Sequence, residues 1–433
     1  MVHLRFSIAA LGAAAFFLLN AAVQAQTFTW GPVHNVDLPA PAVFSNLSPI
    51  DMNGDGNTDI CLSMWGFDAT GSVVQFKYIY TGDGAGNFAA TPITVHESPD
   101  SYAFGTVRFF DVNGDGYADE VYSYSGFNSC CAPQEAHPGV FAVLLGDGKG
   151  NFTQTTSIAQ EITLNNNPAG NGVSVLAAGS FRNNGRLDFA TVFADPSNPG
   201  HGVLTVYVND GGGVFHVGST IGVTGVNPLS PVTGDFDGDG RVDIAWLDAA
   251  PEPGTTNRFA IHCLYGNGDG TFGADQICYT LDGAPFGMLS VNLNGDHKAD
   301  LVVYTGPKVG AKGAQPRLAT LLAKQTGGFY WSSNVPSGGS SYGTTSVYGM
   351  PPLSMEDLNG DGYQDVILGG ENLFAGNANG VFGTLESIGS PGNYNPGYFA
   401  PLKRGGLPAL FYSTNDDGDY STKLSWQLNT SPK

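Results

Sequence analysis

Short apolar runs recur along the whole chain, and polar, glycine-rich segments separate them. Examples are Ile60–Met64, Val140–Leu145 and Leu301–Tyr304. Their length and their content of β-branched and aromatic residues are typical of short buried strands. Patterns with the period of a helix are absent after the first 25 residues. The sequence therefore predicts an all-β protein.

A nine-residue polar loop leads into many of these runs and returns about every 55 to 70 residues. The first copy is Asp51-Met-Asn-Gly-Asp-Gly-Asn-Thr-Asp59, and four similar copies begin at Asp111, Asp235, Asn292 and Asp357. A Gly at position 4 or 6 lets such a loop curl, so the side chains at positions 1, 3, 5 and 9 and the carbonyl at position 7 converge. Calcium accepts a loose shell of oxygens, whereas magnesium needs a near-ideal octahedron and zinc prefers nitrogen or sulfur. The loops therefore predict calcium sites.

The predicted ligands, with position 7 acting through its carbonyl, are Asp51, Asn53, Asp55, Asn57 and Asp59; Asp111, Asn113, Asp115, Tyr117 and Asp119; Asp235, Asp237, Asp239, Arg241 and Asp243; Asn292, Asn294, Asp296, Lys298 and Asp300; and Asp357, Asn359, Asp361, Tyr363 and Asp365.

Two other structures share features with this loop. An EF-hand needs a bidentate Glu at position 12 and flanking helices. Position 12 is instead occupied by apolar or aromatic residues, namely Leu62, Tyr122, Trp246, Val303 and Leu368. A simple turn without metal also fits a single Asn-Gly-Asp-Gly sequence. Five copies with acids at the same offsets favour a metal site that opens a strand.

A second repeat alternates with the first, and it is a Gly-rich turn that ends in Phe. The turns end at Phe88, Phe152, Phe215, Phe272, Phe329 and Phe382. Asp-Gly and Asn-Gly supply the positive φ angles of tight β-hairpins. Phe28 falls in the same phase, so seven intervals result, and the last lacks its own Phe because the chain stops soon after Leu424–Leu428. Pairing of the N-terminal strand with the last blade would remove exposed sheet edges, which predicts a closed seven-bladed β-propeller.

The alternating loops and turns resemble the FG-GAP/VCBS repeats of secreted bacterial proteins, the propeller of integrin α-chains and a fungal lectin of the same shape. The resemblance covers essentially residues 26–433. It implies that the metal loops lie on the face opposite the ligand surface. The third unit departs from the pattern at Ser180, Arg182, Asn184 and Arg186, whose basic side chains would repel a cation, and the seventh unit around Ala400–Pro408 has no acids. Neither is expected to bind metal.

The first 25 residues contain one Arg, an apolar stretch and the exit Val23-Gln-Ala25, which predicts a secretory signal peptide. We expect residues 26–433 to be a single domain that is secreted, periplasmic or on the cell surface. The formal net charge is −21, and 15 of the 38 acidic residues lie in the five intact loops. Such a charge excludes nucleic acid and anionic membranes as favoured partners, and no other apolar stretch is long enough for membrane insertion.

Five cysteines in an exported chain predict disulfides, and the odd count leaves at least one thiol free. Cys263 and Cys278 lie on opposite arms of one predicted hairpin and could be bridged. Cys130 and Cys131 leave a vicinal disulfide open as an alternative. Cys61 enters a buried strand, which predicts a free thiol.

Insertions that interrupt the repeat are the candidate binding segments, since loops on a rigid scaffold often carry function. They are Ser125–Gly139, Thr163–Gly172, Ala249–Arg258 and Tyr330–Pro352. Aromatic residues within the last insertion could stack on sugar rings or merely pack against a blade: Tyr330, Trp331, Tyr342 and Tyr348.

No residue pattern in the chain has the spacing of a known catalytic site. Gly339–Gly343 matches the sequence of a nucleophile elbow, but that elbow needs a strand before it and a helix after it, and the sequence predicts neither. We therefore expect a monomeric, non-enzymatic, calcium-binding propeller that binds a glycan or protein through its insertions. The alternative is a polysaccharide lyase or hydrolase on the same scaffold. Its acid–base residues would be acids such as Glu135, Asp195 or Glu252.

Overall fold

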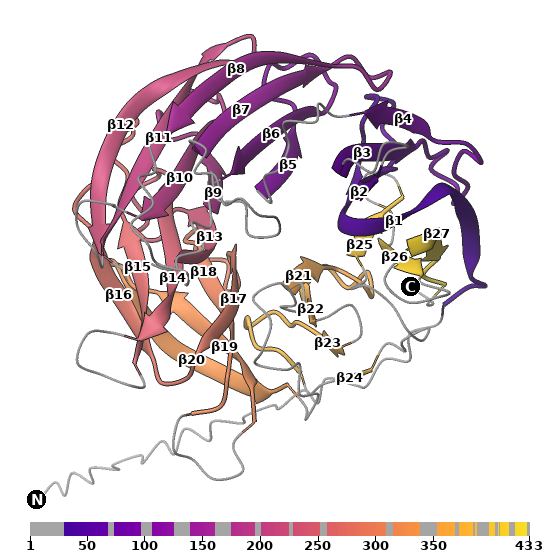
Figure 1. Ribbon diagram of the computed structural model, residues 1–433. Helices are drawn as coiled ribbons and strands as arrows, with labels where there is room; N and C mark the ends of the chain where they lie inside the picture. Colours follow the sequence, from indigo (N-terminus) through magenta and orange to yellow (C-terminus); the bar gives the residue numbers. More distant parts are fainter. Residues whose placement is uncertain are drawn as a thin grey trace, which may run out of the picture.

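The computed structural model describes residues 30–67, 73–96, 106–124, 139–160, 175–194, 201–224, 228–251, 258–308, 315–337, 353–368, 372–383, 386–387, 398–402, 406, 408–414 and 421–430. These residues form 27 β-strands and no helix. Figure 1 shows the strands grouped into blades around a central axis. The predicted all-β fold and the seven-bladed propeller are confirmed.

Each blade is a four-stranded antiparallel sheet in which consecutive strands pair. The strands of blades 1 to 4 are β1 (His34–Ile50), β2 (Asp59–Phe67), β3 (Val73–Tyr80) and β4 (Ile93–His96); β5 (Thr106–Phe110), β6 (Asp119–Tyr124), β7 (Gly139–Gly146) and β8 (Phe152–Gln160); β9 (Val175–Gly179), β10 (Asp188–Ala194), β11 (His201–Gly211) and β12 (Val214–Thr224); and β13 (Pro228–Gly234), β14 (Asp243–Pro251), β15 (Phe259–Leu264) and β16 (Gln276–Leu281).

Those of blades 5 to 7 are β17 (Pro285–Val291), β18 (Asp300–Thr305), β19 (Arg317–Ala323) and β20 (Phe329–Pro336); β21 (Leu353–Glu356), β22 (Asp365–Leu368), β23 (Asn372–Phe374) and β24 (Glu386–Ser387); and β25 (Tyr398–Pro401), β26 (Pro408–Thr414) and β27 (Ser421–Gln427), completed by the start of β1.

Strand β1 closes the ring because it belongs to two blades (Figure 1). Its first part, His34–Asp37, pairs with β27, and its second part, Val43–Ile50, pairs with β2. The β1–β27 register shifts between Asp37 and Ala42, where the strand passes from one blade to the next. The predicted closure by N- and C-terminal strands is therefore confirmed.

The aromatic residue that completes the last hairpin is Trp30. It bridges to Asn429, as Phe88 bridges to Gly82 and Phe272 to Gly266 in complete blades. Phe28, which we expected to open the series, lies outside the described residues. Trp30 lies against the buried cluster between blades 6 and 7.

The hydrophobic core is divided among the interfaces between blades. Seven buried clusters are present in the described residues, and each combines side chains from two consecutive blades. In β14, for example, Ala245 and Leu247 face blade 5, whereas Ile244 and Trp246 face blade 3. Side chains alternate between the two faces of a strand, so strands with both faces covered become apolar throughout. This arrangement lets one domain grow beyond the size of a single core.

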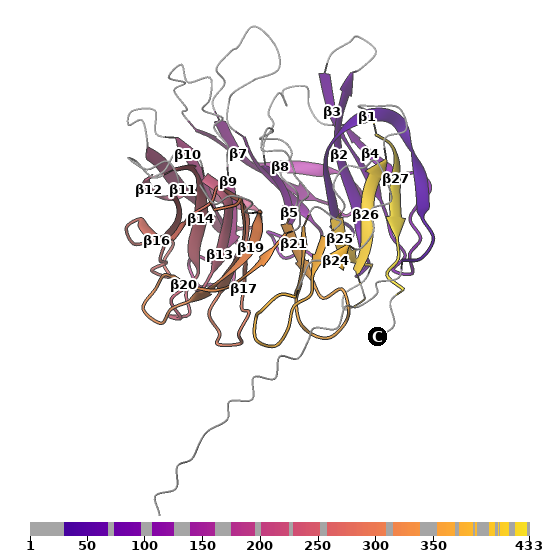
Figure 2. The same cartoon turned by 90° about the horizontal axis from the view of Figure 1, so that it is seen from below.

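The two ends of the ring differ in what they carry. Because the strands of each blade are antiparallel, the loops between first and second strands and the turns between third and fourth strands emerge at the same end, here called the turn end (Figure 2). All other connections attach at the opposite end. The strands that flank the predicted insertions show that these insertions begin and finish there: β6–β7, β8–β9, β14–β15 and β20–β21.

Two predicted insertions start later than expected. Ala249, Ala250 and Pro251 belong to strand β14, so the boundary at Ala249 was wrong. Tyr330 and Trp331 belong to the outer strand β20 and not to a loop, so the boundary at Tyr330 was wrong. Trp331 packs against the cluster between blades 4 and 5, and the guanidinium of Arg317 lies 5.1 Å from the centre of its ring. Tyr342, Tyr348 and the Gly339–Gly343 segment lie outside the described residues.

Candidate metal-binding loops

Each intact loop is curled by hydrogen bonds from its own backbone to its own acidic side chains. In the first loop, the Asp51 carboxylate accepts from the N–H groups of Gly54 at 2.7 Å and Gly56 at 2.8 Å. The Asp55 N–H donates to Asn53 at 3.0 Å. Gly54 and Gly56 have φ angles of 74° and 83°, which L-residues with side chains rarely adopt. The side-chain oxygens of positions 1, 3 and 5 are thereby held inside one tight loop.

The same curl recurs in three further loops. The carboxylates of Asp111, Asp235 and Asp357 accept N–H groups from positions 4 and 6 at 2.6–3.0 Å. In the loop of blade 4, the carboxylates of Asp235, Asp237 and Asp239 offer oxygens within 4.8 Å of one another. Three acidic groups at this spacing could hold a metal ion.

The loop of blade 5 departs from this geometry. Asn292 accepts from the Gly295 N–H at 2.8 Å with its one amide oxygen. His297 stands where the other loops have Gly, and it adopts a φ of 69°. The ammonium of Lys298 lies 2.6 Å from Asp296. Burial raises the pKa of Asp296, but hydrogen bonds and the charge from Lys298 outweigh it and leave this pKa below its usual value.

The last Asp of each loop begins the second strand of its blade and is fully buried. Asp59 accepts from the N–H of Met52 at 3.0 Å and from the N–H of Gly82 at 2.9 Å. It therefore joins its own loop to the end of the third strand. The same two bonds, 2.7–3.0 Å long, recur at Asp119, Asp243, Asp300 and Asp365. Sequence reasoning predicted these residues only as ligands and missed this role in the fold.

These five buried residues are here called the clasp Asp residues: Asp59, Asp119, Asp243, Asp300 and Asp365. Burial raises the pKa of each of their carboxyls, although two backbone N–H donors favour the charged form. The pKa rises to about 6 for Asp59 and to about 7 for Asp243 and Asp365. Neighbouring loop acids add to the rise. A cation beside such a group would favour the ionised form.

The Gly-rich turns lie close against these loops. A Cβ on Gly82 would lie 2.1 Å from the carbonyl oxygen of Thr58, so only Gly fits. The residues at loop position 7 place their N–H on the position-5 carboxylate, as Asn57 does on Asp55 at 2.8 Å. Arg241, Tyr117 and Tyr363 do the same at 2.8–2.9 Å. Their carbonyls were the predicted ligands.

Two pairs of neighbouring loops are joined by backbone hydrogen bonds. The N–H of Ala299 at position 8 of one loop donates to the carbonyl of Asp235 in the preceding loop at 2.8 Å. Thr58 makes the same bond to Leu402 of blade 7 at 2.8 Å. A change in one loop can therefore reach its neighbour.

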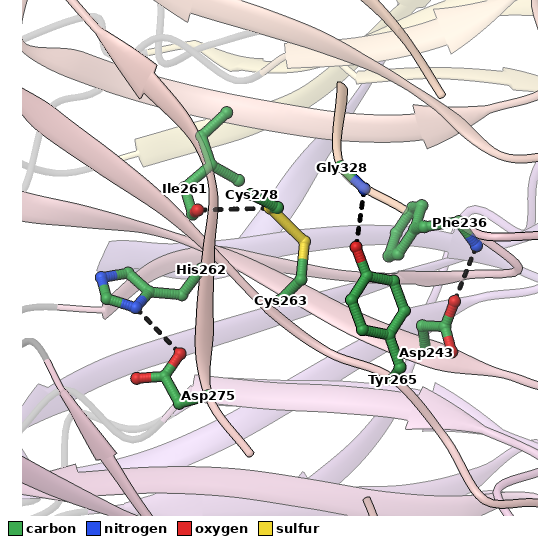
Figure 3. The surroundings of a disulfide bond; sticks show 9 residues. All are labelled: Phe236, Asp243, Ile261, His262, Cys263, Tyr265, Asp275, Cys278 and Gly328. Atoms are coloured by element: carbon green, nitrogen blue, oxygen red, sulfur yellow. Dashed lines mark hydrogen bonds and ion pairs between the residues drawn. A yellow bond between two sulfur atoms is a disulfide. The ribbon is translucent and has the colours of Figure 1, made fainter. Parts of the chain in front are cut away.

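The predicted disulfide between Cys263 and Cys278 is confirmed, with a Cα–Cα distance of 5.8 Å (Figure 3). The Cys278 sulfur also lies 3.2 Å from the Ile261 carbonyl oxygen, a close contact rather than a hydrogen bond because a disulfide sulfur has no proton. Cys61 is free and buried, as predicted. Cys130 and Cys131 lie outside the described residues.

A buried Asp–His pair lies beside the disulfide (Figure 3). His262 Nδ1 is 3.0 Å from Asp275, whose other oxygen accepts from both the N–H and the hydroxyl of Thr224 in blade 3. The side chains of His262 and Asp275 are only 2% and 6% exposed, and His262 stacks on Trp246. A substrate could not reach this pair, so it serves to join two blades. The predicted acid–base residues Glu135, Asp195 and Glu252 lie outside the described residues.

Comparison with known proteins supports the repeat assignment. The model of the FG-GAP-like repeat family matches residues 51–122 and 181–246, which include the loops at Asp51, Asp111 and Asp235. The chain carries FG-GAP-like repeats. Among curated proteins, none matches the sequence.

Solved structures also resemble this FG-GAP repeat chain. An Agrocybe aegerita lectin, described by its recognition of non-reducing terminal N-acetylglucosamine, is 18% identical with a TM-score of 0.50, and the match covers 90% of this chain and 86% of the lectin. At this identity the likeness shows the fold alone. A Photorhabdus luminescens Tc holotoxin pore is 15% identical with a TM-score of 0.36, and this chain spans 16% of it. In the described residues, no helix has the length and apolar character needed to cross a membrane.

Proposed function

We propose that the five intact loops bind calcium and that the ion is structural. Carboxylate, amide and carbonyl oxygens are the donors calcium prefers, and the repeated curl holds them at the same offsets in each loop. The ligands would be the 25 predicted residues, with Asp235, Asp237 and Asp239 as the best supported set because their oxygens already lie within 4.8 Å of one another. Bound calcium would supply positive charge that offsets the mutual repulsion of the loop acids.

The position of the loops explains why this charge would stabilise the whole ring. Each intact loop contacts the end of the third strand of its own blade through its buried clasp Asp. The loops of blades 1 and 5 also contact the preceding blade's loop through a backbone hydrogen bond. A cation that favours the ionised form of the loop acids would therefore tighten both contacts. With a dissociation constant of about 0.1 mM and about 1 mM external calcium, each site contributes about 1.4 kcal/mol, and five contribute about 7 kcal/mol.

We further propose that this calcium-stabilised propeller is a secreted, periplasmic or cell-surface binding protein without enzymatic activity. The observation that carries this proposal is the division between the two ends of the ring. The repeated loops and turns occupy one end, whereas the strands that flank the predicted insertions have the ends to which these segments attach at the opposite end. One end is thus free to vary in sequence without disturbing the loops that stabilise the blades.

A glycan or a protein is the proposed ligand of the opposite end, bound by a monomer. The lectin of the same fold supports a glycan as the first class to test, although its likeness concerns the fold. Glycan arrays probed with the labelled chain in about 1 mM calcium would test the proposal. A variant in which residues 126–138 are replaced by a short Gly-Ser linker should lose binding, whereas Lys149→Ser in a turn at the other end should not. Absence of any bound glycan, together with absence of protein partners on crosslinking, would count against a binding role.

A further inference from the structure

The loop of blade 3, Ser180–Asp188, keeps the clasp Asp of the other loops although it has lost the remaining acids. Asp188 is fully buried and accepts from the Asn209 N–H at 2.9 Å, as the other clasp residues accept from the end of their third strands. Its second oxygen does not receive the N–H of position 2, because Phe181 donates to Gly179 instead. A different group occupies that place.

The guanidinium of Arg182, at loop position 3, donates hydrogen bonds to both oxygens of the Asp188 carboxylate. Its Nη2 donates to one oxygen at 2.7 Å and its Nε to the other at 3.2 Å, a two-pronged pairing with a buried acid. The same Nη2 donates to the carbonyl of Asn209 at 2.6 Å. One side chain therefore joins the loop, the clasp and the end of the third strand.

The surrounding structure holds this arginine in place. The Arg182 side chain is only 22% exposed. The Gly-rich turn of blade 4 lies against it, since a Cβ on Gly270 would lie 3.1 Å from Arg182 Cγ, and the Gly270 N–H donates to Phe181 at 3.1 Å. Arg186 adds a bond from its Nη1 to the carbonyl of Asp210 at 2.7 Å. The side chains of Arg182 and Arg186 therefore hold this loop closed.

We propose that Arg182 replaces, in blade 3, the divalent cation of the other loops, so that this blade stays closed when the metal is removed. The proposal rests on the proposed calcium sites of the five intact loops. Its consequence is an unequal response of the ring to calcium loss. Blades 1, 2, 4, 5 and 6 loosen, whereas blade 3 keeps its loop and its contact with the turn of blade 4.

Hydrogen exchange measured by mass spectrometry on the full chain, with about 1 mM calcium or with EDTA, tests this difference. Chelation should speed exchange about tenfold in peptides that contain the clasp partners, such as the amides of Gly82 and Gly266. Exchange at Asn209 should change by less than about twofold. Arg182→Met, which keeps the length of the side chain and removes its donors, should speed exchange at Asn209 about tenfold both with and without calcium.

Lys149→Met provides the control, because it removes a basic side chain from the exposed turn of blade 2, which supplies no predicted ligand, and should leave exchange at Gly146 in calcium unchanged. Equal protection of Asn209 and Gly82 by calcium would overturn the inference, and so would unchanged exchange at Asn209 in Arg182→Met. If calcium alters exchange in no loop, the proposed calcium sites fail and this inference fails with them. If calcium protects the intact loops but Arg182→Met has no effect, the inference alone fails.

Discussion

Asp235→Asn is the substitution that isolates the contribution of one proposed calcium site. Asp235 accepts from Gly238 and Asp239 with one oxygen and from Gly240 with the other. Asn keeps one acceptor oxygen, and Asn292 shows that the chain tolerates this residue at the same loop position. The variant should therefore fold but lose the carboxylate that joins Asp237 and Asp239 in the acidic cluster.

The expected effect is the loss of one calcium ion and its binding free energy. At about 1 mM calcium and a dissociation constant of about 0.1 mM, the variant should be less stable by about 1.4 kcal/mol. For a chain of this size, an unfolding entropy of about 2.1 cal/mol/K per residue converts this loss into a melting temperature lower by about 1.5–2 °C. In EDTA the two proteins should melt within about 0.5 °C of each other, because neither has calcium to lose.

Differential scanning calorimetry and calcium analysis of the same samples make the comparison. Asp269→Asn is the control, because it removes one charge from the exposed turn of the same blade without touching a predicted ligand. It should leave both the calcium content and the calcium-dependent gain in melting temperature unchanged. An equal calcium content in Asp235→Asn and the parent chain would refute the reasoning. A loss of stability of the same size in EDTA would refute it as well, since the effect would then come from the fold.

Three further predictions follow from the loops and the disulfide. Lys298→Asn frees Asp296 from its ion pair and should bind calcium in the blade 5 loop about fivefold more tightly in isothermal titration calorimetry, whereas an unchanged affinity would show that the lysine does not compete. In EDTA, the clasp carboxyls hold their protons in the folded state up to about pH 6 for Asp59 and about pH 7 for Asp243 and Asp365, but only to about pH 4 when unfolded. The stability that these protons provide is therefore complete below about pH 4 and is lost as the pH rises toward 7. The metal-free chain should melt at a higher temperature at pH 5 than at about pH 7.5. The opposite order would contradict the effect of burial on these carboxyls. The double substitution Cys263→Ala and Cys278→Ala opens a loop with a sequence separation of 15 and should cost about 3 kcal/mol in chemical unfolding, while Cys61→Ala should leave the disulfide intact; a double variant as stable as the parent would contradict this.

The fold was predictable from the sequence because each blade repeats two local signals. The loop at Asp51 fixes the entry to a second strand, and the turn ending at Phe88 fixes the hairpin that follows. Two repeats in fixed alternation determine both the number of blades and the need for closure. The repeat did not show which aromatic residue completes the ring. Phe28 and Trp30 lie two residues apart, and a repeat of about 60 residues that varies in length cannot distinguish between them. Only the register of the chain ends places Trp30 opposite Asn429.

The candidate site was predictable in its composition but not in its connections. The spacing of acids within Asp235–Asp243 indicates a cation shell, and Asp235, Asp237 and Asp239 do lie together. The two N–H bonds of Asp243 come from Phe236 and from Gly266, 23 residues further along the chain, and no local pattern reveals that contact.

The role of Arg182, a basic residue at a position where other loops have an acid or an amide, was not predicted from the sequence. Arg182 read along the sequence indicates only a loop that has lost its metal site. In the folded chain the same side chain forms an ion pair with the buried carboxylate of Asp188 and holds the loop closed. The burial of both partners is a property of the neighbouring blade, which sequence spacing does not encode.

The content of bound calcium tests the central claim most directly. The chain would be brought to equilibrium by dialysis against about 1 mM calcium, and elemental mass spectrometry of the solutions on both sides of the membrane would give the excess calcium bound per chain. Its melting temperature would be measured in the same calcium buffer and in EDTA. The account predicts up to about five calcium ions per chain and, with all sites filled, a melting temperature about 8 °C higher than in EDTA. Less than one ion per chain, with identical melting in EDTA, would contradict it.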